Sequence, residues 1–147
     1  MNNLIFITGL LFLIYFSYKD LKYSEVENKP IIVFMIVGII LSIISNKLLI
    51  VLPFCLFWFF LSYLLWRLKS LGGADVKILS ILPIFYLIDS SNIFYSQLIF
   101  LIFFGIMGTI YGLISKQFNN KNIVPFIPLI TLTFILFRVF FFLGTKN

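Results

Sequence analysis

Long apolar runs dominate this chain and constrain its fold more than any other feature. Of its 147 residues, 62% are hydrophobic and only 11% are charged, whereas a soluble domain is apolar in roughly half of its residues. A soluble fold of this length could not bury so much apolar surface, so the sequence predicts an integral protein of the lipid bilayer. Too little polar sequence lies between the runs to fold alone, and we expect residues 1–147 to form a single membrane domain.

Six apolar runs are candidates for transmembrane helices, which predicts an all-α, polytopic fold with about six spans. A helix needs about 20 residues to cross the hydrocarbon core. The first and fourth runs are shorter, unless each helix continues through the aspartate beside it, Asp20 or Asp75. The first run has no basic segment before it and no cleavage site after it, so we expect a span and not a cleavable signal peptide. The predicted spans are residues 4–18, 31–45, 48–66, 76–88, 93–115 and 123–143.

Basic residues concentrate in the first, third and fifth breaks between these runs. That side carries Lys19, Lys22, Lys29, Arg67, Lys69, Lys77, Lys116 and Lys121, and the other side carries Lys47, Arg138 and Lys146. The positive-inside rule places the richer side in the cytoplasm, so we expect a multi-pass protein of the cell membrane with both termini outside. The net charge of +6 is thereby explained as a topology signal, and we expect no nucleic-acid partner. Asp20 and Asp75 then share the cytoplasmic face, whereas Asp89 lies on the other.

A pair of aspartates at span ends indicates a particular chemistry. A carboxylate at a membrane boundary is costly and usually functional, and the chain has only five acidic residues, no histidine and one cysteine, Cys55. This composition excludes a site built from Cys and His ligands, and we expect neither a metal nor an organic cofactor. Two adjacent carboxylates can hydrolyse an amide, because the ionised one takes a proton from water while the protonated one polarises the carbonyl. Asp20 and Asp75 are the candidate pair.

Small residues precede the second aspartate. Gly72 and Gly73 can adopt positive φ and let a substrate backbone approach closely, while Ala74 leaves room for a cleft; a plain turn that starts a helix is the alternative. Lys77 is expected to extend towards the membrane surface or to tune Asp75. Because a helix N-terminus favours negative charge and a C-terminus disfavours it, we expect Asp75 to carry the charge and Asp20 the proton.

Two further patterns lie in the last two spans. Gly105, Gly108 and Gly112 predict close packing of the fifth span against a neighbouring helix. Pro125 and Pro128 predict the start of the last helix or a kink in it.

These motifs together resemble those of one family. Gly-Gly-Ala-Asp-Val-Lys at residues 72–77 resembles the second active-site motif of type IV prepilin peptidases and archaeal preflagellin peptidases, which are membrane aspartic proteases of the Gly-x-Gly-Asp type. The segment that begins Asp20-Leu-Lys-Tyr-Ser resembles their first motif, and the prolines of residues 124–128 resemble the entry to their last helix. Ala74 departs from the bacterial pattern, which has its second glycine there, but is similar to the small hydrophobic residue of archaeal relatives.

The resemblance implies a peptidase that removes the short basic leader of prepilin-like or preflagellin-like proteins at the cytoplasmic membrane face. It implies that Asp20 and Asp75 are the catalytic pair and that Gly72 is the first motif glycine. Glu25 and Glu27 would then attract the leader by charge, with an ordinary solvated loop as the alternative. The larger bacterial relatives methylate their product with an extra domain that has paired cysteines, so we expect cleavage without N-methylation here.

Two other functions remain open from the sequence. A small ion-coupled transporter would use the carboxylates to carry protons or cations, although transporter sites usually lie near the bilayer midplane. A non-enzymatic assembly subunit would tolerate the loss of either aspartate.

Overall fold

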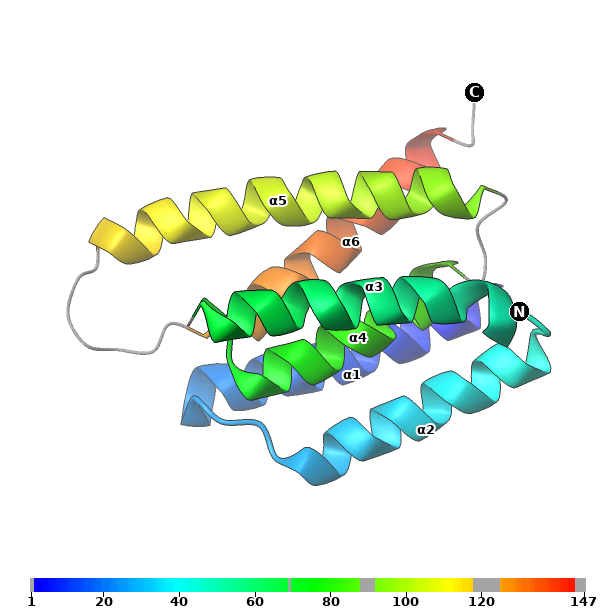
Figure 1. Cartoon of the computed structure of the whole chain (residues 1–147), viewed down its shortest axis with the longest axis horizontal. Helices are drawn as coiled ribbons and strands as arrows, with labels where there is room; N and C mark the ends of the chain where they lie inside the picture. The colour runs from blue at the N-terminus through cyan, green and yellow to red at the C-terminus, as the bar shows by residue number, and fades with distance from the viewer. Residues whose placement is uncertain (1, 69, 88–91, 118–124, 145–147) are drawn as a thin grey trace.

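Six helices form the computed structural model, which describes residues 2–68, 70–87, 92–117 and 125–144 and contains no strand among them (Figure 1). The all-α fold expected from the sequence is confirmed. In chain order the helices are α1 Asn2–Tyr23, α2 Asn28–Ile44, α3 Leu48–Arg67, α4 Gly73–Leu87, α5 Ile93–Gln117 and α6 Ile127–Gly144.

Three of these helices contain segments that are long and apolar enough to cross a membrane, namely Leu4–Tyr23, Leu48–Arg67 and Ile93–Leu113. Two shorter apolar segments, Asn28–Ile44 and Ile127–Phe141, accompany them. Large apolar side chains are exposed along the outer faces of these helices, as expected where lipid takes the place of protein. The first helix continues through Asp20, as its short apolar run requires.

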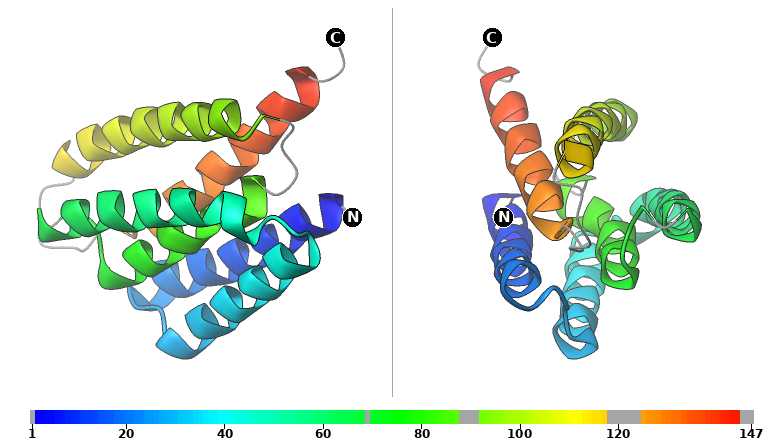
Figure 2. Two further views of the ribbon diagram at one scale, coloured as in Figure 1. Left: turned by 45° about the vertical axis from the view of Figure 1, so that its right-hand side comes forward. Right: turned by 90° about the vertical axis from the view of Figure 1, so that its left-hand side faces the viewer.

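The shortest helix, α4, is the centre of the bundle. Its 15 residues amount to about 22 Å of helix, and α1, α2 and α3 pack around it (Figure 2). A helix that is apolar all round is one that is buried all round, which matches the short continuous run in the sequence. Its buried residues are Asp75, Val76, Ile78, Leu79, Ile81, Leu82, Pro83, Ile84, Phe85, Tyr86 and Leu87.

Two glycines allow the outer helices to approach α4 closely. A Cβ atom at Gly9 of α1 would lie 2.9 Å from Cβ of Phe85, and one at Gly38 of α2 would lie 3.3 Å from Cγ2 of Ile81. Small residues at such points let helix backbones come together in a membrane. The packing predicted for Gly105, Gly108 and Gly112 is wrong, because a Cβ atom at any of them would meet nothing within 4 Å; α5 packs through its phenylalanine side chains instead.

The helices alternate in direction, so their ends form two groups. The ends of α1, α3 and α5 and the starts of α2, α4 and α6 lie together, opposite both ends of the chain (Figure 1). The helix ends beside the first, third and fifth breaks therefore lie at one end of the bundle. Asp20, near the end of α1, and Asp75, in the first turn of α4, are both at that end.

Candidate active site

A cavity of about 950 Å³ opens at this end of the bundle, and both aspartates line it. Its walls come from the ends of α1 and α3, the connections that follow them, the start of α4, the second half of α5 and the residue before α6. Gly72, Gly73 and Ala74 also line it. The two motifs that are far apart in the sequence therefore meet at one concave surface.

Asp20 is held at the N-terminus of α6. Its side chain is only 9% exposed, and its Oδ2 accepts a hydrogen bond of 3.0 Å from the backbone N–H of Ile127, the first residue of α6. The first N–H groups of a helix have no partner within the helix and favour an anion, so they offset part of the cost of burying a charge on Asp20.

A second contact fixes α1 against α6 beside Asp20. The hydroxyls of Ser17 and Thr131 are 2.6 Å apart in a buried hydrogen bond. Thr131 also donates to the backbone carbonyls of Leu13 and Ile127. These bonds hold the last turns of α1 on the first turn of α6, so the Asp20 carboxylate and its backbone donors are placed together by helix packing.

Asp75 is held by the start of its own helix. It is 6% exposed, and its Oδ2 accepts a hydrogen bond of 2.7 Å from the backbone N–H of Gly72. An acidic side chain in the first turn that reaches back to the N–H before the helix is half of a capping box. The expected positive φ at Gly72 and Gly73 is wrong, because no described glycine has one. At Gly72 the constraint is steric: a Cβ atom there would lie 3.2 Å from Oδ2 of Asp75.

Burial dominates the ionisation of Asp75. Desolvation raises the pKa of this carboxyl to about 6, and the negative charge of Asp20 adds to the rise, whereas the hydrogen bond from Gly72 opposes it. From the helix ends alone, we expected the charge on Asp75 and the proton on Asp20. In the structure Asp75 is buried, and Asp20 lies at the N-terminus of α6, a segment distant from it in the sequence. These two features favour the opposite assignment.

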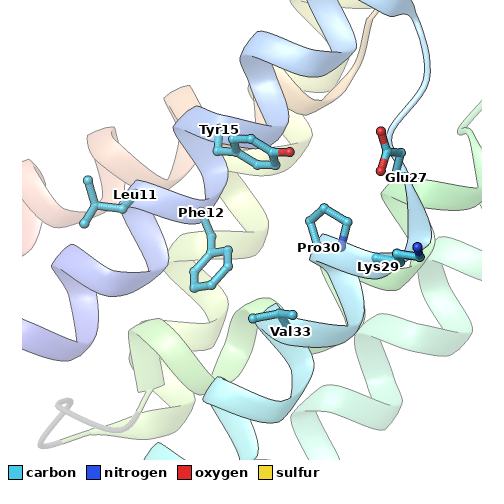
Figure 3. A pocket seen from close by; sticks show the side chains of 7 residues that line it. All are labelled: Leu11, Phe12, Tyr15, Glu27, Lys29, Pro30 and Val33. Atoms are coloured by element: carbon cyan, nitrogen blue, oxygen red, sulfur yellow. The ribbon is translucent and has the colours of Figure 1, made fainter.

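Of the other predicted site residues Glu25, Glu27 and Lys77, only Glu25 lines the cavity that holds the aspartates. Glu27 lines a different, mostly apolar cavity of about 540 Å³ between α1 and α2 (Figure 3). Lys77 does not line the cavity of the aspartates, and its Nζ donates to Oδ1 of Asn28 at 2.7 Å. Lys77 thus ties the start of α4 to the start of α2.

The remaining predictions concern the last helix and residues that the structure does not describe. Pro125 precedes α6 and Pro128 lies in its first turn, which confirms the predicted helix entry. Asp89, Lys69, Lys121 and Val124 lie outside the described residues. Among the described residues, no three Asp, Glu or Cys side chains gather in a way that could hold a metal ion.

The sequence reasoning missed Tyr111 of α5. This half-buried tyrosine lines the cavity, and its hydroxyl donates to the carbonyl oxygen of Pro125 at 3.0 Å. Gly108 and Gly112, which were read as packing residues, line the cavity beside it. The available signal was a tyrosine between two glycines near the end of a largely apolar span.

Comparison with known proteins agrees with the motif resemblance. Residues 7–113 match the family model described as the type IV leader peptidase family, and this range contains both aspartates. No curated protein matches the chain, and no solved structure matches it.

Proposed function

The chain belongs to the type IV leader peptidase family, and we propose that it is a membrane aspartic endopeptidase whose catalytic pair is Asp20 and Asp75. The observation that carries this proposal is the shared cavity: two buried carboxylates from separate helices line it, and the charge of one acts on the pKa of the other. Gly72, Gly73 and Ala74 support Asp75 from the segment before it and from the start of its helix.

In the reaction we propose, the Asp20 carboxylate takes a proton from water as the water oxygen attacks the carbonyl carbon of the scissile peptide. The protonated Asp75 donates its proton to the carbonyl oxygen, which gives a neutral tetrahedral intermediate. Asp20 then passes its proton to the leaving amine as the C–N bond breaks. As the C=O bond re-forms, one of the two hydroxyl groups of the intermediate gives its proton to Asp75. Both carboxyl groups thereby regain their initial state.

The substrates we propose are prepilin-like or preflagellin-like proteins, of which the enzyme removes a short basic leader. Glu25 in the wall of the cavity and Glu27 beyond it supply the negative charge that would attract such a leader. Basic residues are in excess in the first, third and fifth breaks of the sequence. This excess supports a cytoplasmic active site in a multi-pass protein of the cell membrane. The sequence forms a single peptidase domain over residues 1–147, and we propose cleavage without N-methylation, with no metal or organic cofactor.

The test is cleavage of a tagged prepilin-like protein by the purified full-length protein in liposomes. The wild type is expected to cut at the leader junction, and Asp20→Asn and Asp75→Asn are each expected to lower the rate at least about a hundredfold, because each removes a proton donor or acceptor from the reaction. Helical circular dichroism of each variant verifies that it is folded. Activity that survives either substitution would refute the catalytic pair.

A further inference from the structure

Tyr111 connects the wall of the cavity to the segment that leads into α6. Its hydroxyl donates to the carbonyl oxygen of Pro125 at 3.0 Å, and its ring meets that of Phe126 edge-on, with centroids 5.5 Å apart. The same side chain lines the cavity that holds both aspartates. Tyr111 therefore contacts the two residues that immediately precede α6.

The peptide group between Pro125 and Phe126 lies between Tyr111 and Asp20. Its carbonyl accepts the hydrogen bond from Tyr111, and its N–H belongs to Phe126, the residue directly before the donor to Asp20. The next N–H along the chain, that of Ile127, donates to Oδ2 of Asp20. Linked hydrogen bonds polarise and orient one another, so the Tyr111 hydroxyl acts on Asp20 through this peptide.

The sequence of this segment leaves few ways to replace that link. Proline has no backbone N–H, so within Pro125–Pro128 only Phe126 and Ile127 can donate to Asp20. The backbone bonds from Leu129 and Ile130 to the Phe126 carbonyl belong to the first turn of α6. They do not reach Pro125, whose carbonyl is held from outside α6 by Tyr111.

We propose that Tyr111 is a positioning residue for the peptidase reaction: by holding the Pro125 carbonyl, it keeps the start of α6 and the Ile127 N–H aligned on Asp20. The proposal rests on the catalytic role proposed for Asp20. Other titratable or charged groups near Asp20 are Asp75 of α4, Glu25 of the α1–α2 connection, and Lys19 and Lys22 of α1, which lie over the ring of Tyr23. None of these groups forms a hydrogen bond with the Tyr111 hydroxyl in the structure, which donates to the carbonyl oxygen of Pro125.

The experiment compares Tyr111→Phe with the wild type in the full-length protein in liposomes. The phenylalanine retains the ring contact with Phe126 and loses only the hydroxyl. We expect kcat to fall roughly fivefold, as for the loss of one hydrogen bond, with KM unchanged. The acidic limb of the pH profile of kcat should move to higher pH, because the Asp20 carboxylate loses part of its stabilisation. Tyr95→Phe, at an exposed tyrosine of the same helix, is the matched control and should change neither quantity.

A second readout does not depend on cleavage. The infrared band of a protonated carboxyl group that Asp20→Asn removes should appear at a higher pH in Tyr111→Phe than in the wild type. An unchanged band together with an unchanged kcat profile would overturn the role of Tyr111, as would a rise in KM alone, which would indicate substrate contact. Cleavage that survives Asp20→Asn would instead refute the catalytic pair, while the infrared band would still report the link between Tyr111 and Asp20.

Discussion

Replacing Gly72 by alanine tests the geometry of the site with the smallest change that the chain allows. The added methyl carbon would lie 3.2 Å from Oδ2 of Asp75 and 3.9 Å from its Cγ. A contact of this length is tighter than most real Cβ contacts, so the carboxyl group must withdraw by a few tenths of an ångström, taken below as roughly 0.3 Å. It would do so against its 2.7 Å hydrogen bond from the Gly72 N–H.

The expected loss of activity combines two effects. Lengthening the hydrogen bond to about 3.0 Å weakens it without breaking it. A loss of roughly half of its net value of about 1 kcal/mol corresponds to roughly a twofold change in rate. Misplacing a catalytic group by about 1 Å can lower the reaction rate about a hundredfold. If the logarithm of the rate falls in proportion to the displacement, a shift of roughly 0.3 Å lowers the rate roughly fourfold. We therefore expect Gly72→Ala to lower kcat roughly tenfold.

The assay is steady-state cleavage of a prepilin-like substrate, with kcat and KM determined separately. Gly73→Ala is the matched control, because it adds the same methyl group one residue later, where nothing lies within 4 Å, and its kcat should stay within about twofold of the wild type. Both variants should keep the helical circular dichroism of the wild type. Equal values of kcat for the two variants would refute the steric account of Gly72.

Two other predictions concern ionisation and packing. Because burial raises the pKa of Asp75 to about 6 and the proposed reaction needs this group protonated, kcat/KM should fall as pH rises through about 6; a rise over the same interval would give Asp75 the role of the base. Gly9→Ala should lower the thermal midpoint in detergent, at a cost of about 1–3 kcal/mol, because the new methyl would lie 2.9 Å from Cβ of Phe85, which cannot move without the backbone. Gly105→Ala, where the space is open, should leave the midpoint unchanged, and equal effects of the two substitutions would contradict the packing described for α1 and α4.

The architecture was predictable from the sequence because it depends on hydropathy. Apolar runs separated by short polar breaks fix the number and order of the helices, and their alternating direction brings the first, third and fifth breaks to one end. Which helix becomes the centre does not follow from hydropathy. All six runs are apolar, so the central position of α4 depends on close approaches such as that of Gly9 to Phe85. A glycine that packs and a glycine that lines a cavity look alike in the sequence, which is why Gly108 was misinterpreted.

The candidate pair was identified in the sequence, but its electrostatic environment was not. A carboxylate at a span end is conspicuous in a chain with five acidic residues. The charge preference of Asp20 could not be inferred from its own helix, because its backbone hydrogen-bond donor comes from Ile127, more than one hundred residues later. The separation of Glu25 from Glu27 likewise depends on how the α1–α2 connection turns between two cavities.

Both candidate catalytic carboxylates take backbone N–H groups as hydrogen-bond donors, and this has a consequence for how the site responds to change. Gly72 supplies the donor to Asp75, and Ile127 supplies one to Asp20. A backbone donor moves only with its helix, so the distance between the two carboxyl groups is set by how α1, α4 and α6 pack, and not by the rotamers of neighbouring side chains. Substitutions that shift these helices should therefore alter catalysis from a distance, and the buried Ser17–Thr131 bond, which joins α1 to α6 one turn from Asp20, is where such coupling should be strongest.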